Sequence, residues 1–133
     1  MAKKKEESKN GKKGYIEVLE SRSREGVDKK YENEILLIPK IDIWEREDGY
    51  TLVAEVPGIK KDELNIKVTN EELVLQGKKD DKFKEKGENI LSELDKGVYF
   101  RRFRIKKEID CEKITANLEN GMLLINFPLR KLE

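Results

Sequence analysis

Apolar and polar residues alternate with a period of two over much of the chain from residue 39 onward. This period is typical of β-strands that bury one face, because successive side chains point to opposite sides of a sheet. Residues that favour turns separate the alternating runs, and no stretch shows the period of a convincing amphipathic helix. The pattern predicts an all-β protein whose antiparallel strands pack as a sandwich. The expected strands are 41–44, 50–56, 64–69, 73–77, 98–105, 114–118 and 122–127.

Two dipeptides predict tight turns between neighbouring strands. Asn120-Gly121 separates the last two runs and is the strongest short hairpin signal, because both central residues of a type I′ turn need a positive φ. Asp48-Gly49 separates the first two runs in the same way. We therefore predict a hairpin at the beginning and another at the end of the alternating region.

A long charged connection interrupts the regular spacing of the strands. Residues 78–88 (KKDDKFKEKGE) are almost entirely charged and predict an exposed loop. A loop of this length in a compact domain is usually functional or disordered. The stretch 89–94 within the same connection predicts an isolated short strand, because it carries apolar side chains that a charged loop has no intrinsic reason to contain: Ile90, Leu91 and Leu94.

Residues 1–38 differ in character from the rest of the chain. Lys, Glu, Ser, Gly and Asn dominate the first part, and such a composition buries too little apolar surface to offset the entropy lost on ordering. Two apolar islands interrupt it, at 15–19 and 35–38. We predict a polar, mostly disordered N-terminal tail over 1–38.

Composition narrows the function. The 133 residues suffice for one domain, and 43% of them are charged. Because Lys+Arg (29) and Asp+Glu (28) nearly cancel to a net charge of +1, we expect no nucleic-acid partner, which would favour a strong basic excess. No apolar segment approaches the roughly 18 residues that span a bilayer, so we expect no membrane partner. One cysteine, Cys111, excludes an intrachain disulfide, and we expect a cytoplasmic protein.

Histidine is absent from the sequence. Its absence removes the commonest general base, the commonest metal ligand and the nucleophile arrangements that depend on an imidazole. A single cysteine likewise excludes zinc sites built from Cys and His. We therefore expect no enzyme, no catalytic residues, no metal and no cofactor.

Four segments in order resemble the small heat-shock protein (Hsp20, α-crystallin domain) family. They span about residues 39–129 and lie at 39–45 (PKIDIWE), 55–64 (EVPGIKKDEL), 97–105 (GVYFRRFRI) and 114–123, where ITA precedes NGML. The resemblance implies an immunoglobulin-like β-sandwich with a long strand-exchange loop. It also implies an ATP-independent chaperone of the stress response, a holdase that binds partly unfolded client proteins and limits their aggregation.

The resemblance implies a client groove at a sheet edge between the strands near 64–68 and 114–118. An extended peptide can add to such an edge, with alternate side chains filling apolar pockets. The alternative is that most of these side chains are structural and face the sandwich core. The candidate groove residues are Leu64, Ile66, Val68, Ile114, Ala116 and Leu118.

The resemblance also implies a homodimer formed by exchange of the loop strand onto the first strand of a partner, with larger homo-oligomers as a further state. Exchange would bury the apolar loop residues and cover an open edge. Arg101 matches the family's arginine in this strand and implies an ion pair at the interface, the alternative being a solvated charge. The candidate interface residues are Ile41, Ile43, Trp44, Ile90, Leu91, Leu94 and Arg101.

The family normally carries a C-terminal Ile-x-Ile motif that fills a neighbour's edge groove. The end of this sequence, 130–133, is expected to be a short tail without that motif. We hypothesise that an N-terminal pair of apolar residues with one spacer docks into the groove instead, of its own or a neighbouring chain. The candidates are Ile16 with Val18, Ile35 with Leu37, and Leu36 with Ile38.

Two alternatives to the holdase remain open from the sequence. One is a p23/CS-like co-chaperone, which uses the same sandwich to dock a specific folded partner. The other is an assembly module of a larger complex. The loop strand and the Asn-Gly hairpin favour the holdase.

Overall fold

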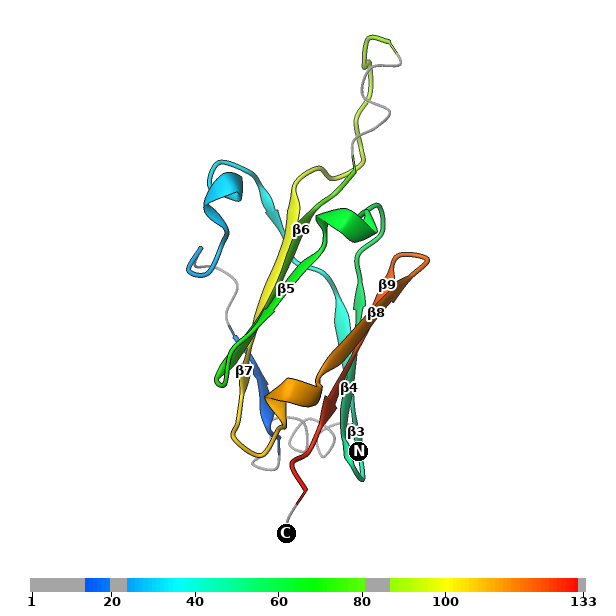
Figure 1. Cartoon of the computed structure of the whole chain (residues 1–133). Helices are drawn as coiled ribbons and strands as arrows, with labels where there is room; N and C mark the ends of the chain where they lie inside the picture. The colour runs from blue at the N-terminus through cyan, green and yellow to red at the C-terminus, as the bar shows by residue number, and fades with distance from the viewer. Residues whose placement is uncertain (1–13, 20–23, 81–86, 132–133) are drawn as a thin grey trace, which may run out of the picture.

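Two β-sheets pack face to face in the computed structural model, which describes residues 14–19, 24–80 and 87–131 (Figure 1). The first sheet has the order β1-β7-β6-β5, with β2 also paired to β7, and the second has the order β3-β4-β9-β8. The predicted all-β sandwich is confirmed. The strands are β1 (Ile16–Val18), β2 (Leu36–Leu37), β3 (Ile41–Arg46), β4 (Gly49–Glu55), β5 (Asn65–Val68), β6 (Glu72–Lys78), β7 (Val98–Ile105), β8 (Thr115–Glu119) and β9 (Met122–Pro128).

The helical elements of the described residues are three single turns of 3-10 helix. They are η1 (Lys29–Tyr31), η2 (Lys61–Glu63) and η3 (Cys111–Lys113). No helix in this part of the chain is long and apolar enough to cross a bilayer. The short turns connect strands and leave the two sheets to supply the core.

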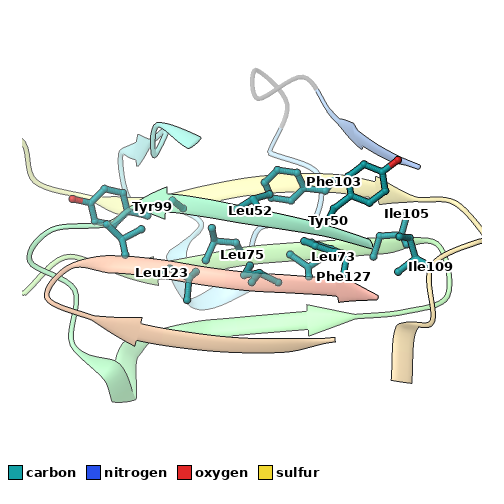
Figure 2. Packing of buried hydrophobic residues seen from close by; sticks show 13 residues of the cluster. Tyr50, Leu52, Leu73, Leu75, Tyr99, Phe103, Ile105, Ile109, Leu123 and Phe127 are labelled. Carbon is teal, nitrogen blue, oxygen red and sulfur yellow. The ribbon is translucent and has the colours of Figure 1, made fainter. Parts of the chain in front are cut away.

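The core lies between the sheets, where alternate residues of the central strands meet. Leu123, Ile125 and Phe127 of β9 are fully buried, while Met122 and Leu124, which alternate with them, stay exposed. Figure 2 shows the labelled core side chains converging from both sheets. Burial of each apolar side chain of this size contributes about 1.5–3 kcal/mol to the free energy of folding. Because the apolar residues of a strand alternate, turning the strand over would expose all of them, and this cost determines which face points inward.

The hairpin at Asn120-Gly121 forms as predicted. Glu119 pairs with Met122, and the two turn residues have φ values of 52° and 78°. Positive φ at both central positions identifies the type I′ geometry that suits the twist of the flanking strands.

The first hairpin turns one residue earlier than predicted. Arg46 pairs with Gly49, so the two turn residues are Glu47 and Asp48, and Gly49 begins β4. A Cβ atom on Gly49 would lie 2.2 Å from the Phe127 carbonyl oxygen. The glycine therefore permits the close approach of β9 and does not form the turn.

The N-terminal region is more ordered than the sequence predicts. Strand β1 pairs antiparallel with β7, in the register Ile16 to Ile105, and β2 pairs with β7 in parallel, in the register Leu36 to Val98. The prediction of a mostly disordered tail is wrong for residues 14–19 and 24–38, and the remainder of 1–38 lies outside the described residues. The order comes from tertiary pairing with β7, which a local composition cannot reveal.

Candidate functional site

The edge predicted as a groove is formed by the last strand of each sheet. Strands β5 and β8 each pair on one side, with β6 and β9, and no described strand pairs with their other side. Both lie along the same side of the sandwich (Figures 1 and 2). Open edges present unpaired N–H and C=O groups to which an extended peptide can add.

The six candidate groove residues divide into two groups at this edge. Four are half-buried and pack against the core cluster: Leu64, Ile66, Ile114 and Leu118. Val68 is 37% exposed, and Ala116 is exposed as well. The half-buried group matches both the core and the groove interpretations, since each side chain shows one part to the core and another to solvent.

A single helical turn precedes each strand of this edge, η2 before β5 and η3 before β8. Helix η2 ends at Glu63 and η3 ends at Lys113, and a single apolar residue, Leu64 or Ile114, follows each turn before β5 or β8 begins. The Asp110 carboxylate accepts a hydrogen bond from the Glu112 amide at 3.3 Å and so caps η3. A cap of this kind fixes where the helical turn begins and hence the direction of the strand that follows.

The edge predicted for the dimer lies on the other side of the second sheet, at β3. Ile41 and Ile43 face inward and pack against the core cluster, whereas Trp44 is 59% exposed. No described strand covers the free side of β3. The first strand of this sheet therefore offers both an open backbone edge and an exposed aromatic ring.

The loop that was predicted to supply the exchanged strand extends away from the sandwich (top of Figure 1). Residues 87–96 form no strand in the single chain and are exposed throughout. Three large apolar side chains stand in solvent there, with exposed fractions of 95% for Ile90, 73% for Leu91 and 81% for Leu94. An open hollow of about 480 Å³ lies between this loop and residues 33–35.

Arg101 lies on the core-facing side of β7, between Tyr99 and Phe103. Its Nη1 donates a hydrogen bond of 2.7 Å to the Pro39 carbonyl oxygen, just before β3. Burial lowers the pKa of Arg101, and its Nε has no hydrogen-bond partner in the structure. Within the described residues the side chain binds backbone and no carboxylate, so the interface ion pair stays a prediction.

The predicted N-terminal plugs contact β7 in the single chain. Ile16 and Leu37 pack against the core cluster, while Val18 is 37% and Ile35 is 67% exposed. Because β6 separates β7 from β5, these residues do not reach the groove edge of their own chain. Their docking into a neighbouring chain stays a prediction.

Sequence reasoning missed a second buried surface, on the outer face of the first sheet. Four residues of β6 and β7 that point away from the core are buried: Val74, Gln76, Val98 and Phe100. The signal was present, since both strands carry apolar residues at consecutive positions, which indicates burial on both faces. Alternation alone assigned only one of these faces to the core.

Comparisons with known proteins agree with this geometry. Residues 42–133 match the Hsp20/alpha crystallin family. The chain is 35% identical over 96 residues to small heat shock protein C2 of Rickettsia felis, covering 71% of this chain and 62% of that protein. It is 30% identical over 102 residues to a probable 15 kDa heat shock protein of Leptospira interrogans, covering 77% and 78%.

Solved structures show the same arrangement of strands. Heat shock protein 16.0 from Schizosaccharomyces pombe superposes with a TM-score of 0.69 at 25% identity, over 86% of this chain and 78% of that one. A small heat-shock protein from Xylella fastidiosa superposes with a TM-score of 0.65 at 26% identity, over 73% and 90%. The chain spans less than two thirds of the length of its Rickettsia relatives, at 62% for both.

Proposed function

The chain belongs to the Hsp20/alpha crystallin family, and from this premise we propose that it is an ATP-independent chaperone, a holdase that binds partly unfolded proteins and limits their aggregation. The relatives named above are heat shock proteins, which favours this function over the co-chaperone and assembly alternatives. No catalytic step is part of the proposal.

One observation carries the proposal: apolar edges stay open on a heavily charged body. Half-buried Leu64, Ile66 and Leu118 line a pair of edges to which no described strand is paired. A client that exposes an extended apolar segment can add its backbone to the edge and its side chains to the pockets. The surrounding charge, 43% of all residues, keeps such a surface soluble.

The dimer is proposed to form by strand exchange. Residues 89–94 of one chain would pair with the free edge of β3 in its partner, where they would meet Ile41, Ile43 and Trp44. The exposed loop side chains support this proposal, because three large apolar groups in solvent are costly unless a partner covers them. Arg101, which already bonds to the chain just before β3, would lie beside the exchanged strand.

A cytoplasmic location remains a proposal. It is supported by the single cysteine, Cys111, which is half-buried and packs against the core cluster. A chain that uses no disulfide is suited to a reducing compartment.

The groove is tested with two charged substitutions at its exposed positions, Val68→Asp and Ala116→Asp. Neither residue packs against the core cluster, so the fold is expected to persist. Both positions lie on the strand face that carries Ile66 and Leu118, so a carboxylate there would meet the apolar side chains of a bound segment. We therefore expect the double variant to suppress the heat aggregation of a thermolabile enzyme at least about threefold less well, without ATP, as measured by light scattering.

Asn117→Asp is the matched control, because it adds a charge to the same strand, on the face away from the core. It is expected to behave as the wild type. No suppression by the wild type at several-fold excess would contradict the holdase function itself, whereas full activity of the double variant would contradict the groove.

A further inference from the structure

The buried outer face of the first sheet has a cover that comes from the chain itself. We define the outer face as Val74, Gln76, Val98 and Phe100, with exposed fractions of 8%, 0%, 0% and 1%. None of the four belongs to the cluster between the sheets. The cover is residues 24–34, called here the covering segment, which runs beside β6 and β7 in blue to cyan (Figure 1).

Gln76 binds the backbone of the covering segment. Its side-chain Oε1 accepts from the Asp28 amide at 2.8 Å, and its Nε2 donates to the Gly26 carbonyl at 3.3 Å. These two groups flank Val27, so the glutamine amide pairs with the segment as a neighbouring residue would in a parallel β-bridge. Recognition through backbone groups does not depend on the sequence that is bound.

An aromatic side chain accompanies this backbone pairing. Tyr31 is 5% exposed and is the buried residue of η1, yet it is not part of the sandwich core. Lys29, Lys30, Glu32 and Asn33 around it are all exposed. The covering segment thus binds the face through two backbone hydrogen bonds, and its one buried aromatic side chain, Tyr31, is called here the anchor.

Two ion pairs also join the segment to β6 and β7. Glu34 pairs with Lys78 at 3.2 Å, and Glu25 lies 3.8 Å from Arg102, with the Glu25 side chain 74% exposed. The Lys78 and Glu25 side chains of these pairs are largely exposed, which limits what the pairs contribute to stability. Gly26 has a φ of +93°, a conformation that other residues adopt only with strain. The segment is joined to the sheet through Gln76 and these ion pairs and belongs to neither strand ladder, so we expect it to open more readily than a strand of the sandwich.

We propose that the outer face is a second peptide-binding site, held closed by the covering segment, and that it takes an extended segment of an unfolded client that carries an aromatic residue. The proposal rests on the holdase function and adds a site on a different surface from the β5/β8 edge. The covering segment shows what fits: an extended backbone paired to Gln76 and one aromatic ring in the place of Tyr31. A client supplies both features without any particular sequence.

Two variants of the full chain open the cover without replacing a residue of the outer face. Tyr31→Ser removes the anchor, and Gly26→Ala strains the turn, with Asn33→Ser and Gly87→Ala as matched controls. Gly87 also has a positive φ, and nothing lies within 4 Å of the position of its Cβ. Because a covered site binds more weakly in proportion to the fraction of open molecules, we expect both opening variants to bind at least about threefold more tightly.

Binding is measured by fluorescence anisotropy with two labelled probes. One is a synthetic peptide with the sequence of residues 24–34, and the other is a reduced, carboxymethylated protein that cannot fold. Gln76→Leu, combined with each opening variant, is expected to abolish the gain. The resonances of the Gln76 side-chain amide, followed by NMR, are expected to shift on binding to Tyr31→Ser.

The results of these measurements separate the second site from the holdase function. Unchanged affinity in both opening variants, or a gain that survives Gln76→Leu, would overturn the second site. Growth of the oligomer in the opening variants with no tighter client binding would assign the face to a second copy of the chain instead. If the wild type suppresses aggregation while the opening variants bind no better, the second site fails and the holdase function stands. If the wild type neither suppresses aggregation nor binds the unfolded protein, both proposals fail.

Discussion

Tyr99 carries a hydroxyl group into the apolar end of the sandwich. Its Oη donates a hydrogen bond of 2.6 Å to the Pro57 carbonyl oxygen, and the residue is 6% exposed. Burial raises the pKa of Tyr99, and the nearby carboxylates of Asp95 and Glu55 add to the rise. The folded chain therefore keeps this proton at a pH where the unfolded chain, with a pKa of about 10, loses it.

The sign of the pH effect follows from the raised pKa. The contribution of Tyr99 is fully present below about pH 10 and is lost as the pH rises through the folded pKa. We expect Tyr99→Phe to cost about 0.5–1.5 kcal/mol at pH 8, the value of a typical hydrogen bond, and less as the pH rises above 10. Urea unfolding of the wild type and the variant, at pH 8 and at a pH above 10, measures this cost. A difference in stability between the two proteins that does not change with pH would contradict the prediction.

Gly121 has a backbone conformation that favours glycine over other residues. Its φ of 78° lies in the left-handed region, where a side chain costs about 1–2 kcal/mol. Gly121→Ala is therefore expected to lower the free energy of unfolding by that amount, as measured by denaturant titration. Asn117→Ala, on an exposed position of the same hairpin, serves as the control and is expected to change stability by less than about 0.5 kcal/mol.

At the scale of elements, strands with their own apolar periodicity could be predicted from the sequence. Strands that are ordered only by a distant partner could not. Strands β3 to β9 follow the predicted runs, because each buries at least one face against the same core. The chain at β1, η1 and β2 has no period of its own and is ordered by β7 and by Gln76, which lie far along the sequence. The open edges of β5 and β8 agree with the resemblance, and their use as a groove stays a prediction, whereas the covered outer face depends on a tertiary contact of residues 24–34.

Strand β1 is expected to open locally without unfolding the sandwich. The Lys106 amide donates to the Tyr15 carbonyl at 2.9 Å and the Val98 amide donates to the Ile35 carbonyl at 2.8 Å, so each reports on a different N-terminal pairing. Ile16→Ser removes part of the apolar contact of β1, worth about 1.4 kcal/mol. We expect hydrogen exchange at the Lys106 amide to accelerate about tenfold while the Val98 amide keeps its protection. Equal acceleration at both amides would mean that the N-terminal region opens as one unit.

At the scale of the whole molecule, the loop and the open edge of β3 predict a concentration-dependent dimer. Replacing Ile90, Leu91 and Leu94 together by Ser removes side chains that would each gain about 1.5–3 kcal/mol on full burial. We expect the dimer dissociation constant to rise at least about tenfold, as measured by sedimentation or multi-angle light scattering. Stability of the monomer should not change, because these side chains touch solvent in the single chain.

Leu124→Ser is the control for this prediction. Leu124 is 37% exposed on the outer face of β9, away from the loop, and its replacement is expected to leave the dissociation constant unchanged. A wild-type chain that stays folded and monomeric at high concentration would contradict strand exchange altogether.

The pairing of β1 and β2 with β7 has a consequence for folding during synthesis on the ribosome. Residues 16–18 and 36–37 leave the ribosome well before their partners, which lie at 103–105 and 98–99. At about 5–20 residues per second, the first segments wait several seconds for a strand to join. Strand β4 also waits for β9, which ends only at Pro128. The first sheet cannot close until Ile105 has been made, nor the second until Pro128, and until then this protein is itself the kind of unfolded chain that a holdase binds.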